Sequence, residues 1–208
     1  MTDNFKVHEF WPTPVYENYI SVKSSWLDFI QNGEYHRAKT NTSDSTNDRH
    51  ILNSLPDLKD RLLFHVNMFA KEYLKVKNLQ FYFLNSWILK HHQNDFARPH
   101  FHSNSLLSGV YYLQTENNSG VLEFLKKYDS QTVFPVAISP DFSEYNYTNS
   151  EALALKPKNG TLVIFPSTLI HQVGKNESEK IRYSLAFNIF CKGTLENDGF
   201  TLGLNNET

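Results

Sequence analysis

The spacing of apolar residues changes along the chain at about residue 79. From Pro56 to about Lys75, apolar residues recur every three or four positions, which predicts one helix with a buried stripe. We assign Ser54 as its N-cap, with Pro56 in the first turn. Beyond this helix the pattern becomes strand-like, in the runs 80–89, 106–114, 121–125, 161–165, 169–173 and 181–190.

Turn-forming residues separate these runs, at 116–120, 158–160 and 174–176. Many short strands after one or two helices favour a mainly β fold, a barrel or sandwich with flanking helices on one outer face. A length of 208 residues suits one well-filled core, so we expect a single domain over residues 1–192. Residues 193–208 are polar and are expected to form a loosely held C-terminal extension.

Two further segments are predicted to be loops. Residues 32–53 carry Asn, Thr, Ser, Asp and His without an apolar period, and residues 129–150 are rich in Tyr and Phe. Long loops often carry function, so both are candidate lids over a barrel mouth, although simple surface loops would look the same.

Composition and charge narrow the class of protein. The formal net charge of −2 and the scattered Lys and Arg residues argue against nucleic acid as a partner. The single cysteine, Cys191, excludes an intramolecular disulfide, and no apolar run approaches the roughly 20 residues that span a bilayer. We expect a cytoplasmic protein that binds neither nucleic acid nor membrane. Its oligomeric state is left open, with a homodimer as one option.

Histidines supply the candidate chemistry. Because residues two apart on an extended backbone project to the same side, His100 and His102 can converge on one point. A strand, a Pro turn and another strand would bring His171 back across the barrel. Three neutral imidazoles on one face of an ion leave positions free, as in non-haem iron sites, although zinc would accept the same nitrogens. His91 and His92 are adjacent on a strand and point to opposite faces, so they cannot both reach that ion.

The run 181–190 has a polar face. Strict alternation puts Arg182, Ser184, Ala186 and Asn188 on one side of the strand and apolar residues on the other. A guanidinium offers a planar fork to a carboxylate, and a hydroxyl two residues on can add a second donor. This face suits an acid bound end-on, although an exposed strand face with an Arg ion pair would give the same pattern.

On these residues the chain resembles the Fe(II)/2-oxoglutarate oxygenase superfamily, and within it a family common in marine bacteria and their phages. The likeness rests on Asn85-Ser86-Trp87, Pro99-His100-Phe101-His102, the run from Leu107 to Leu113, and the run from Gly160 through His171 to Ser184. The opening segment 10–15 also fits, so the resemblance covers nearly the whole chain. It implies a double-stranded β-helix (a jelly roll or cupin-like barrel) and a hydroxylase that uses Fe(II), 2-oxoglutarate and O2. Prolyl or other amino-acid side chains, free or in a peptide, are the leading class of small-molecule or peptide substrate.

The resemblance also implies residue roles. In the superfamily a His-x-carboxylate and a distal His hold iron, and an Arg-x-Ser binds the far carboxylate of 2-oxoglutarate. By position, iron binding falls on His100, His102 and His171. Binding of 2-oxoglutarate falls on Arg182, Ser184, Asn188, Trp87 and Tyr112.

The iron site departs from the superfamily at His102, where an Asp or Glu is usual. A different registry therefore stays open, in which His102 is the first ligand and Asn104, Asp95 or Glu123 approaches the metal. Two other functions also stay open: a cupin-like three-His metal dioxygenase that does not use 2-oxoglutarate, and a non-catalytic β-barrel binding module. Binding of 2-oxoglutarate in the presence of iron separates the first function from both.

Overall fold

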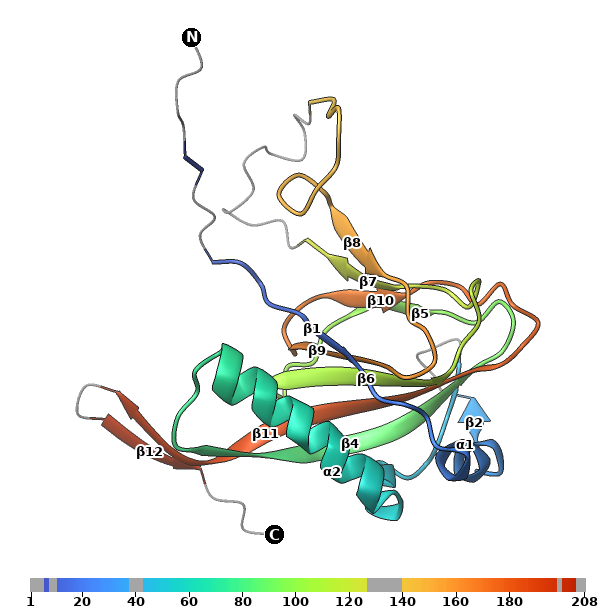
Figure 1. Ribbon diagram of the computed structural model, residues 1–208, viewed down its shortest axis with the longest axis horizontal. Coiled ribbons are helices and arrows are strands. Elements are labelled where there is room, and N and C mark those ends of the chain that lie inside the picture. The colour runs from blue at the N-terminus through green and yellow to red at the C-terminus, as the bar shows by residue number, and fades with distance from the viewer. Residues whose placement is uncertain (1–5, 8–10, 38–42, 127–139, 198–199, 205–208) are drawn as a thin grey trace.

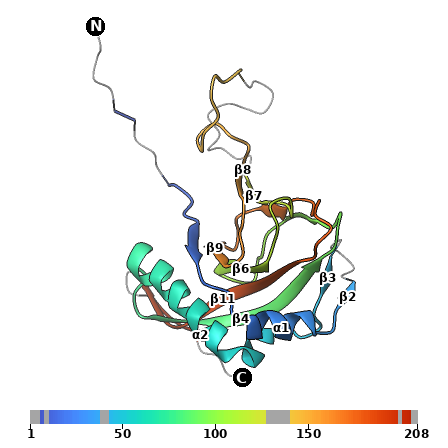
Figure 2. The same cartoon turned by 45° about the vertical axis from the view of Figure 1, so that its right-hand side comes forward.

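A computed structural model describes residues 6–7, 11–37, 43–126, 140–197 and 200–204. As predicted, strands predominate, and they form two antiparallel sheets. The larger sheet runs in the order β1-β9-β6-β11-β4-β3-β2, with β12 attached to β11, and the smaller in the order β5-β10-β7-β8. The smaller sheet lies over one face of the larger (Figures 1 and 2), so that each sheet has an inward face.

The larger sheet contains β1 (Tyr16–Tyr19), β2 (His36–Arg37), β3 (Asp44–Ser45), β4 (Leu79–His91), β6 (Leu107–Gln114), β9 (Thr161–Pro166), β11 (Arg182–Asn197) and β12 (Phe200–Leu204). The smaller sheet contains β5 (Ala97–His100), β7 (Leu122–Leu125), β8 (Ala152–Leu155) and β10 (His171–Val173). The six strand-like runs of the sequence all correspond to strands.

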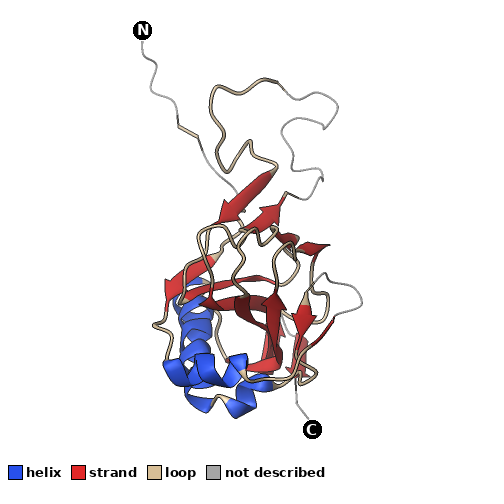
Figure 3. Ribbon diagram, turned by 90° about the vertical axis from the view of Figure 1, so that its right-hand side faces the viewer, coloured by secondary structure: helices blue, strands red, loops and turns tan. Residues whose placement is uncertain are grey.

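Helices gather on one side of the strands (Figure 3). They are α1 (Ser24–Gln31), the 3₁₀ turn η1 (Ile51–Ser54) and α2 (Pro56–Asn67), which continues into a π-helical segment, η2 (Met68–Tyr73). The predicted helix from Pro56 is confirmed. Its predicted cap is wrong, because Ser54 belongs to the preceding 3₁₀ turn and Leu55 holds the N-cap position without a side-chain hydrogen bond. None of the helices in the described part of the chain is long and apolar enough to cross a bilayer.

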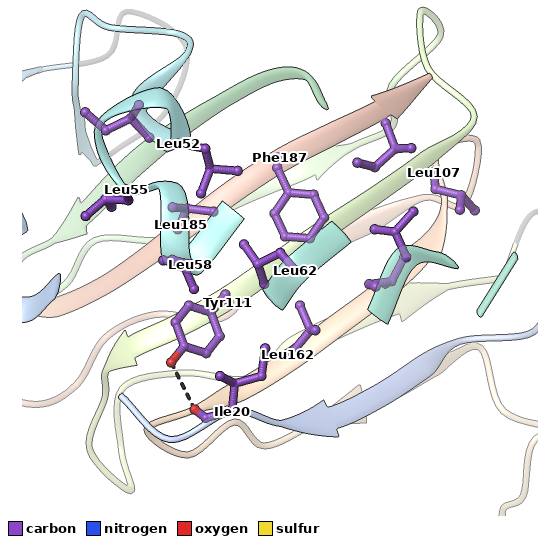
Figure 4. Close-up of a cluster of buried hydrophobic side chains, with 14 of the residues drawn as sticks. Ile20, Leu52, Leu55, Leu58, Leu62, Leu107, Tyr111, Leu162, Leu185 and Phe187 are labelled. Atoms are coloured by element: carbon purple, nitrogen blue, oxygen red, sulfur yellow. Dashed lines mark hydrogen bonds between the residues drawn. The ribbon is translucent and has the colours of Figure 1, made fainter. Parts of the chain in front are cut away.

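The main core lies between α2 and the outer face of the larger sheet (Figure 4). Leu58 and Leu62 of α2 are fully buried, and they pack with Leu185 and Tyr111 from the sheet. The Tyr111 hydroxyl donates to the carbonyl of Ile20 at 2.9 Å, so its burial leaves no polar atom unpaired. The apolar side of β11 therefore faces the helices, and its polar side faces the smaller sheet.

Substitution in α2 tests this packing. Leu62→Ala should lower the free energy of unfolding by about 2–5 kcal/mol, because it removes buried methyl groups and leaves a cavity. Phe64→Ala is a matched control on the same helix, since Phe64 is 61% exposed; it should change stability by no more than about 0.5 kcal/mol. Urea unfolding measures both variants. Equal losses would contradict the burial of this face of α2.

Several short elements differ from the sequence prediction. The short elements α1, β1 and β8 were not anticipated. The predicted loop 32–53 contains β2 and β3 and runs into η1, and its residues 38–42 lie outside the described part. β11 runs past residue 192 and pairs with β12, from Gly193 opposite Leu204 to Asn197 opposite Phe200. Residues 193–204 of the expected C-terminal extension therefore include the two strands of a β-hairpin, which are joined by backbone hydrogen bonds. Of the candidate lid 129–150, residues 129–139 lie outside the described part.

Candidate active site

Three histidines converge between the two sheets. His100 ends β5 and is the register partner of His171, which begins β10. His102 follows two residues after His100. The ring centroids lie 4.3 Å apart for His100 and His171, 5.3 Å for His100 and His102, and 5.4 Å for His102 and His171. One ring nitrogen of each lies within 4.8 Å of the others, so the three could hold one metal ion.

Backbone carbonyls orient two of these rings. His100 Nδ1 hydrogen-bonds the carbonyl of Arg98 at 2.7 Å, and His171 Nδ1 hydrogen-bonds the carbonyl of Leu169 at 2.9 Å. Because a carbonyl can only accept, Nδ1 carries the proton in both rings and Nε2 keeps its lone pair. That tautomer presents Nε2 to a metal.

A chain of buried hydrogen bonds supports the backbone at His102. The His102 N–H donates to the carbonyl of Ser167 at 2.8 Å. Ser167 Oγ lies 2.9 Å from both Ser105 Oγ and Ser108 Oγ, and Ser108 donates to Asn188 Oδ1 at 2.7 Å. These hydrogen bonds tie the segment after the H-x-H motif to β6 and β11 through Ser167, which directly follows β9. They therefore hold His102 in place through the backbone.

Asn188 belongs to this supporting chain. Its Oδ1 accepts from Ser108, and its Nδ2 donates to Asn85 Oδ1 at 2.9 Å. Along β11 it is six residues from Arg182, a separation of roughly 20 Å at about 3.3 Å per residue. The structure thus places Asn188 apart from Arg182, and its contact with 2-oxoglutarate stays a prediction.

Burial keeps two of the three imidazoles neutral. Burial, together with the smaller effect of the charge of the neighbouring His100, lowers the pKa of His171 to about 3 and that of His102 to about 4. Metals bind the neutral form of histidine, so protons would compete weakly with a metal near neutral pH.

These pKa values predict a pH dependence of stability. Between the folded-state pKa and the ordinary value of 6.5, the unfolded chain binds more protons than the folded chain. The free energy of unfolding of the metal-free protein should therefore be highest above about pH 6.5 and fall as the pH drops towards about 4. Urea unfolding across this range measures it. The double variant His102→Asn, His171→Asn should show a shallower fall, and an equal fall would contradict the burial of these rings.

In the alternative registry, Asn104, Asp95 or Glu123 would approach the metal. Among the described residues, no carboxylate belongs to the group of possible ligands. Asp95 is bound by Arg37 through two hydrogen bonds of 2.9 and 2.6 Å. Glu123 accepts a hydrogen bond from Gln172 at 2.5 Å. Asn104 is exposed. Within the described ranges, the group of possible ligands consists of the three histidines.

The inward face of the larger sheet connects the triad with Arg182. The ring centroid of Trp87, on β4, lies 6.4 Å from that of His102. Further along the face, Ser184 on β11 pairs with Tyr112 on β6, and Arg182 lies two residues before Ser184 on the same strand. Alternate residues of a strand share a face. The structure therefore brings Arg182, Ser184 and Tyr112 together, with Trp87 nearer the histidines.

Arg182 is buried without a carboxylate partner. Its side chain is 1% exposed, and Nη1 donates to the carbonyl of Ser119. Nε and Nη2 have no hydrogen-bond partner, and Arg182 takes part in none of the ion pairs of the described residues. Burial lowers the pKa of Arg182, and the electrostatic interactions with Tyr112 and Asp95 partly oppose this shift. A buried guanidinium without a counter-charge is unfavourable, so this position fits an anion with several acceptor oxygens.

Gly120 makes the turn that presents the Ser119 carbonyl to Arg182. Its φ is +84°, and a Cβ there would overlap the carbonyl of Gly174. Both the left-handed backbone and the close approach favour glycine.

The position of His91 next to Arg182 was not predicted from the sequence. As predicted, His91 lies apart from the possible metal ligands. Its register partner, however, is Arg182. Strand pairing of this kind joins residues far apart in sequence, so no local signal could have placed the two together.

Two facing antiparallel sheets, a His triad that could hold a metal ion and a buried arginine are the features expected of an enzyme of the double-stranded β-helix class. Solved structures confirm the fold. An oxidoreductase of the 2OG-Fe(II) oxygenase family from Burkholderia pseudomallei has a TM-score of 0.57 at 15% identity, over 85% of this chain and 84% of that one. HygX from Streptomyces hygroscopicus, with nickel and 2-oxoglutarate bound, has a TM-score of 0.59 at 12% identity, over 86% and 83%. A prolyl-4-hydroxylase from Pseudomonas putida has a TM-score of 0.53 at 14% identity, over 85% and 92%.

The family described as "Putative 2OG-Fe(II) oxygenase" matches residues 85–188, half of the chain, and this range includes every predicted site residue. The chain belongs to this family. It is therefore a 2-oxoglutarate-dependent, non-haem iron oxygenase that uses Fe(II), 2-oxoglutarate and O2. Because the chain belongs to this family, the two other functions are not retained: a three-His dioxygenase that does not use 2-oxoglutarate, and a non-catalytic binding module. No curated protein matches the sequence.

Proposed function

We propose that the protein hydroxylates a small molecule or an amino-acid side chain, free or in a peptide. In this proposal iron is held by His100, His102 and His171, and 2-oxoglutarate is held by Arg182 and Ser184. One observation carries the proposal: a buried guanidinium without a counter-charge lies on the inward face of the larger sheet, which faces the smaller sheet that carries His100 and His171.

The histidines fit iron in their donor chemistry. Imidazole nitrogens suit Fe(II), and they also suit nickel and zinc. HygX, which has the same fold, has been crystallised with nickel and with iron. With His102 in place of a carboxylate, the site is one charge unit more positive than is usual. An anionic co-substrate would then supply negative charge that a carboxylate ligand otherwise provides.

The Arg182 end of the face fits the far carboxylate of 2-oxoglutarate. Nε and Nη2 are two neighbouring donors without partners, the geometry that a carboxylate accepts. Ser184 is 3% exposed and adds a hydroxyl two residues away on the same side. Burial raises the pKa of Tyr112 to about 12, so its hydroxyl stays protonated and can donate as well.

The chain's own residues position the reactants and limit access of water. Bound iron and 2-oxoglutarate together supply the redox chemistry in which O2 oxidises the co-substrate to succinate and carbon dioxide and oxidises the substrate. Phe165 packs against His171, with ring centroids 4.7 Å apart, and shields that side of the triad. Arg182 fixes the orientation of the co-substrate from its far end.

We expect the substrate to contact Trp87. Its partly exposed ring adjoins His102, and the Arg49 guanidinium lies 5.7 Å from its centroid. The neighbours include HygX with hygromycin B bound and a prolyl-4-hydroxylase, which supports a small-molecule or prolyl-type substrate. We also propose a cytoplasmic protein, since Cys191 is a buried free thiol.

Production of succinate tests this function. Protein loaded with Fe(II) is incubated with 2-oxoglutarate in air, alone and with proline-containing peptides, amino acids or aminoglycosides, and succinate is followed by NMR. Slow iron-dependent formation of succinate is expected without substrate, and faster formation with a substrate that gains one oxygen atom. If iron-loaded protein forms no succinate under any of these conditions, the proposal is wrong.

A further inference from the structure

Buried side-chain atoms without a hydrogen-bond partner gather at one end of the inward face. In the described part of the chain there are seven such atoms, and they belong to His36, Ser43, Ser45, His91 and Arg182. We call these five residues the unpaired polar cluster. Folded proteins pair nearly all their buried polar groups. A concentration of exceptions in one place therefore marks a binding site.

His91 is the member of the cluster closest in register to Arg182. The two are directly opposed in the β4–β11 ladder, so their side chains share the inward face with Cα atoms about 4.5–5.5 Å apart. His91 is 1% exposed, and neither of its ring nitrogens has a partner. Burial lowers its pKa well below the usual value, and the charge of Arg182 lowers it further. The ring is therefore neutral and carries one N–H beside the guanidinium.

The edge strand β3 adds hydroxyl groups to the same end of the face. Ser45 pairs with Leu89, which in turn pairs with Ser184, so Ser45 and Ser184 lie in one row across the sheet. Ser45 is 1% exposed, and Ser43, just before β3, is fully buried. Neither hydroxyl has a partner. Both serines lie outside residues 85–188, the part of the chain that matches the family.

We propose that His91 is a further co-substrate-binding residue, which donates a ring N–H to the carboxylate of 2-oxoglutarate held by Arg182, with the hydroxyls of Ser43 and Ser45 completing the set of donors. The inference rests on the proposed function, because it requires Arg182 to hold that carboxylate. A carboxylate has about four lone-pair positions. The fork of Arg182 fills two of them, and in a buried site the others need donors as well.

The binding of two oxo acids tests this role. Iron-loaded protein is titrated anaerobically with 2-oxoglutarate and, separately, with pyruvate, which has the 2-oxo acid but lacks the second carboxylate. His91→Leu should weaken 2-oxoglutarate binding about 10- to 100-fold, as expected for a lost hydrogen bond to a charged group, and leave pyruvate binding unchanged. His91→Asn keeps one donor and should recover part of the loss. His65→Gln, on α2 beyond the outer face of the sheet, is the matched control and should change neither affinity.

Thermal unfolding of the ligand-free protein gives a second readout. Because His91→Leu removes a buried ring without partners, it should raise the melting temperature by about 2–4 °C. It should also reduce the further rise that 2-oxoglutarate produces in the wild type. A lower melting temperature would show that the ring is stabilised by partners of its own, which contradicts the inference.

Three outcomes of the titrations separate the possible failures. Equal losses of 2-oxoglutarate and pyruvate affinity in His91→Leu would indicate a structural role and overturn the inference. A large loss in Arg182→Ala with none in His91→Leu would overturn the role of His91 and leave the proposed function intact. No loss in either variant would overturn the proposed function itself.

Discussion

Arg182→Ala is expected to weaken 2-oxoglutarate binding roughly 30- to 4,000-fold. Loss of a bidentate charged contact costs about 2–5 kcal/mol when the partner charge is left buried, and each 1.4 kcal/mol is about tenfold in affinity. Iron affinity should change far less. Arg182 is four residues along β11 from Ala186, the register partner of Trp87, and it is the Trp87 ring that adjoins His102. Anaerobic titrations of one protein preparation with each ligand measure both effects.

Two further variants make this test specific. Arg182→Lys should recover only part of the affinity, because an ammonium group cannot reproduce the planar fork. Lys90→Ala is a matched control. Lys90 belongs to the strand opposite Arg182, but its Nζ lies 5.2 Å from the Tyr35 ring centroid, on the other face of the sheet. Unchanged affinity in both Arg182 variants would move the role to another cation, with Arg98 the first to examine.

His102→Ala is expected to weaken Fe(II) binding by more than about 100-fold. Loss of a group that only orients a ligand already costs about 10- to 100-fold, and a lost ligand should cost more. His102→Asp restores the carboxylate usual at this position, so it should keep iron. It should nevertheless lose turnover, because the hydrogen-bonded chain through Ser167 supports the backbone of an imidazole ligand.

Iron affinities of the wild type and both variants decide the role of His102. Equal affinity in all three would remove His102 from the metal site. His50→Ala serves as the control, because His50 is exposed and lies outside the group of possible ligands.

The strong periodic signals in the sequence predicted the fold well. The three-and-four spacing from Pro56 predicted α2, and strict alternation in 181–190 separated the core face of β11 from its polar face. Short elements gave no such signal. α1 buries only Trp26 and Ile30, and the apolar alternation in β12 spans only five residues.

The parts of the site that depend on the spacing of residues within one strand could be predicted from the sequence. Two histidines two residues apart share a direction, and Arg182 and Ser184 share a face, whatever the rest of the fold. The position of His91 could not be predicted in the same way. Alternation gives its direction, but its neighbour is set by the pairing of β4 with β11, which joins residues about ninety positions apart. Burial without partners, which identifies the polar cluster, is visible only in three dimensions.

Anaerobic titration of the metal-free protein with Fe(II) and then 2-oxoglutarate tests the central claim most directly. If the three histidines hold iron and Arg182 holds the far end of the co-substrate, a weak visible charge-transfer band should appear only when both are present. The same additions to His171→Ala should give no band. Tight binding of Fe(II) to the wild type without a band on addition of 2-oxoglutarate would contradict the account.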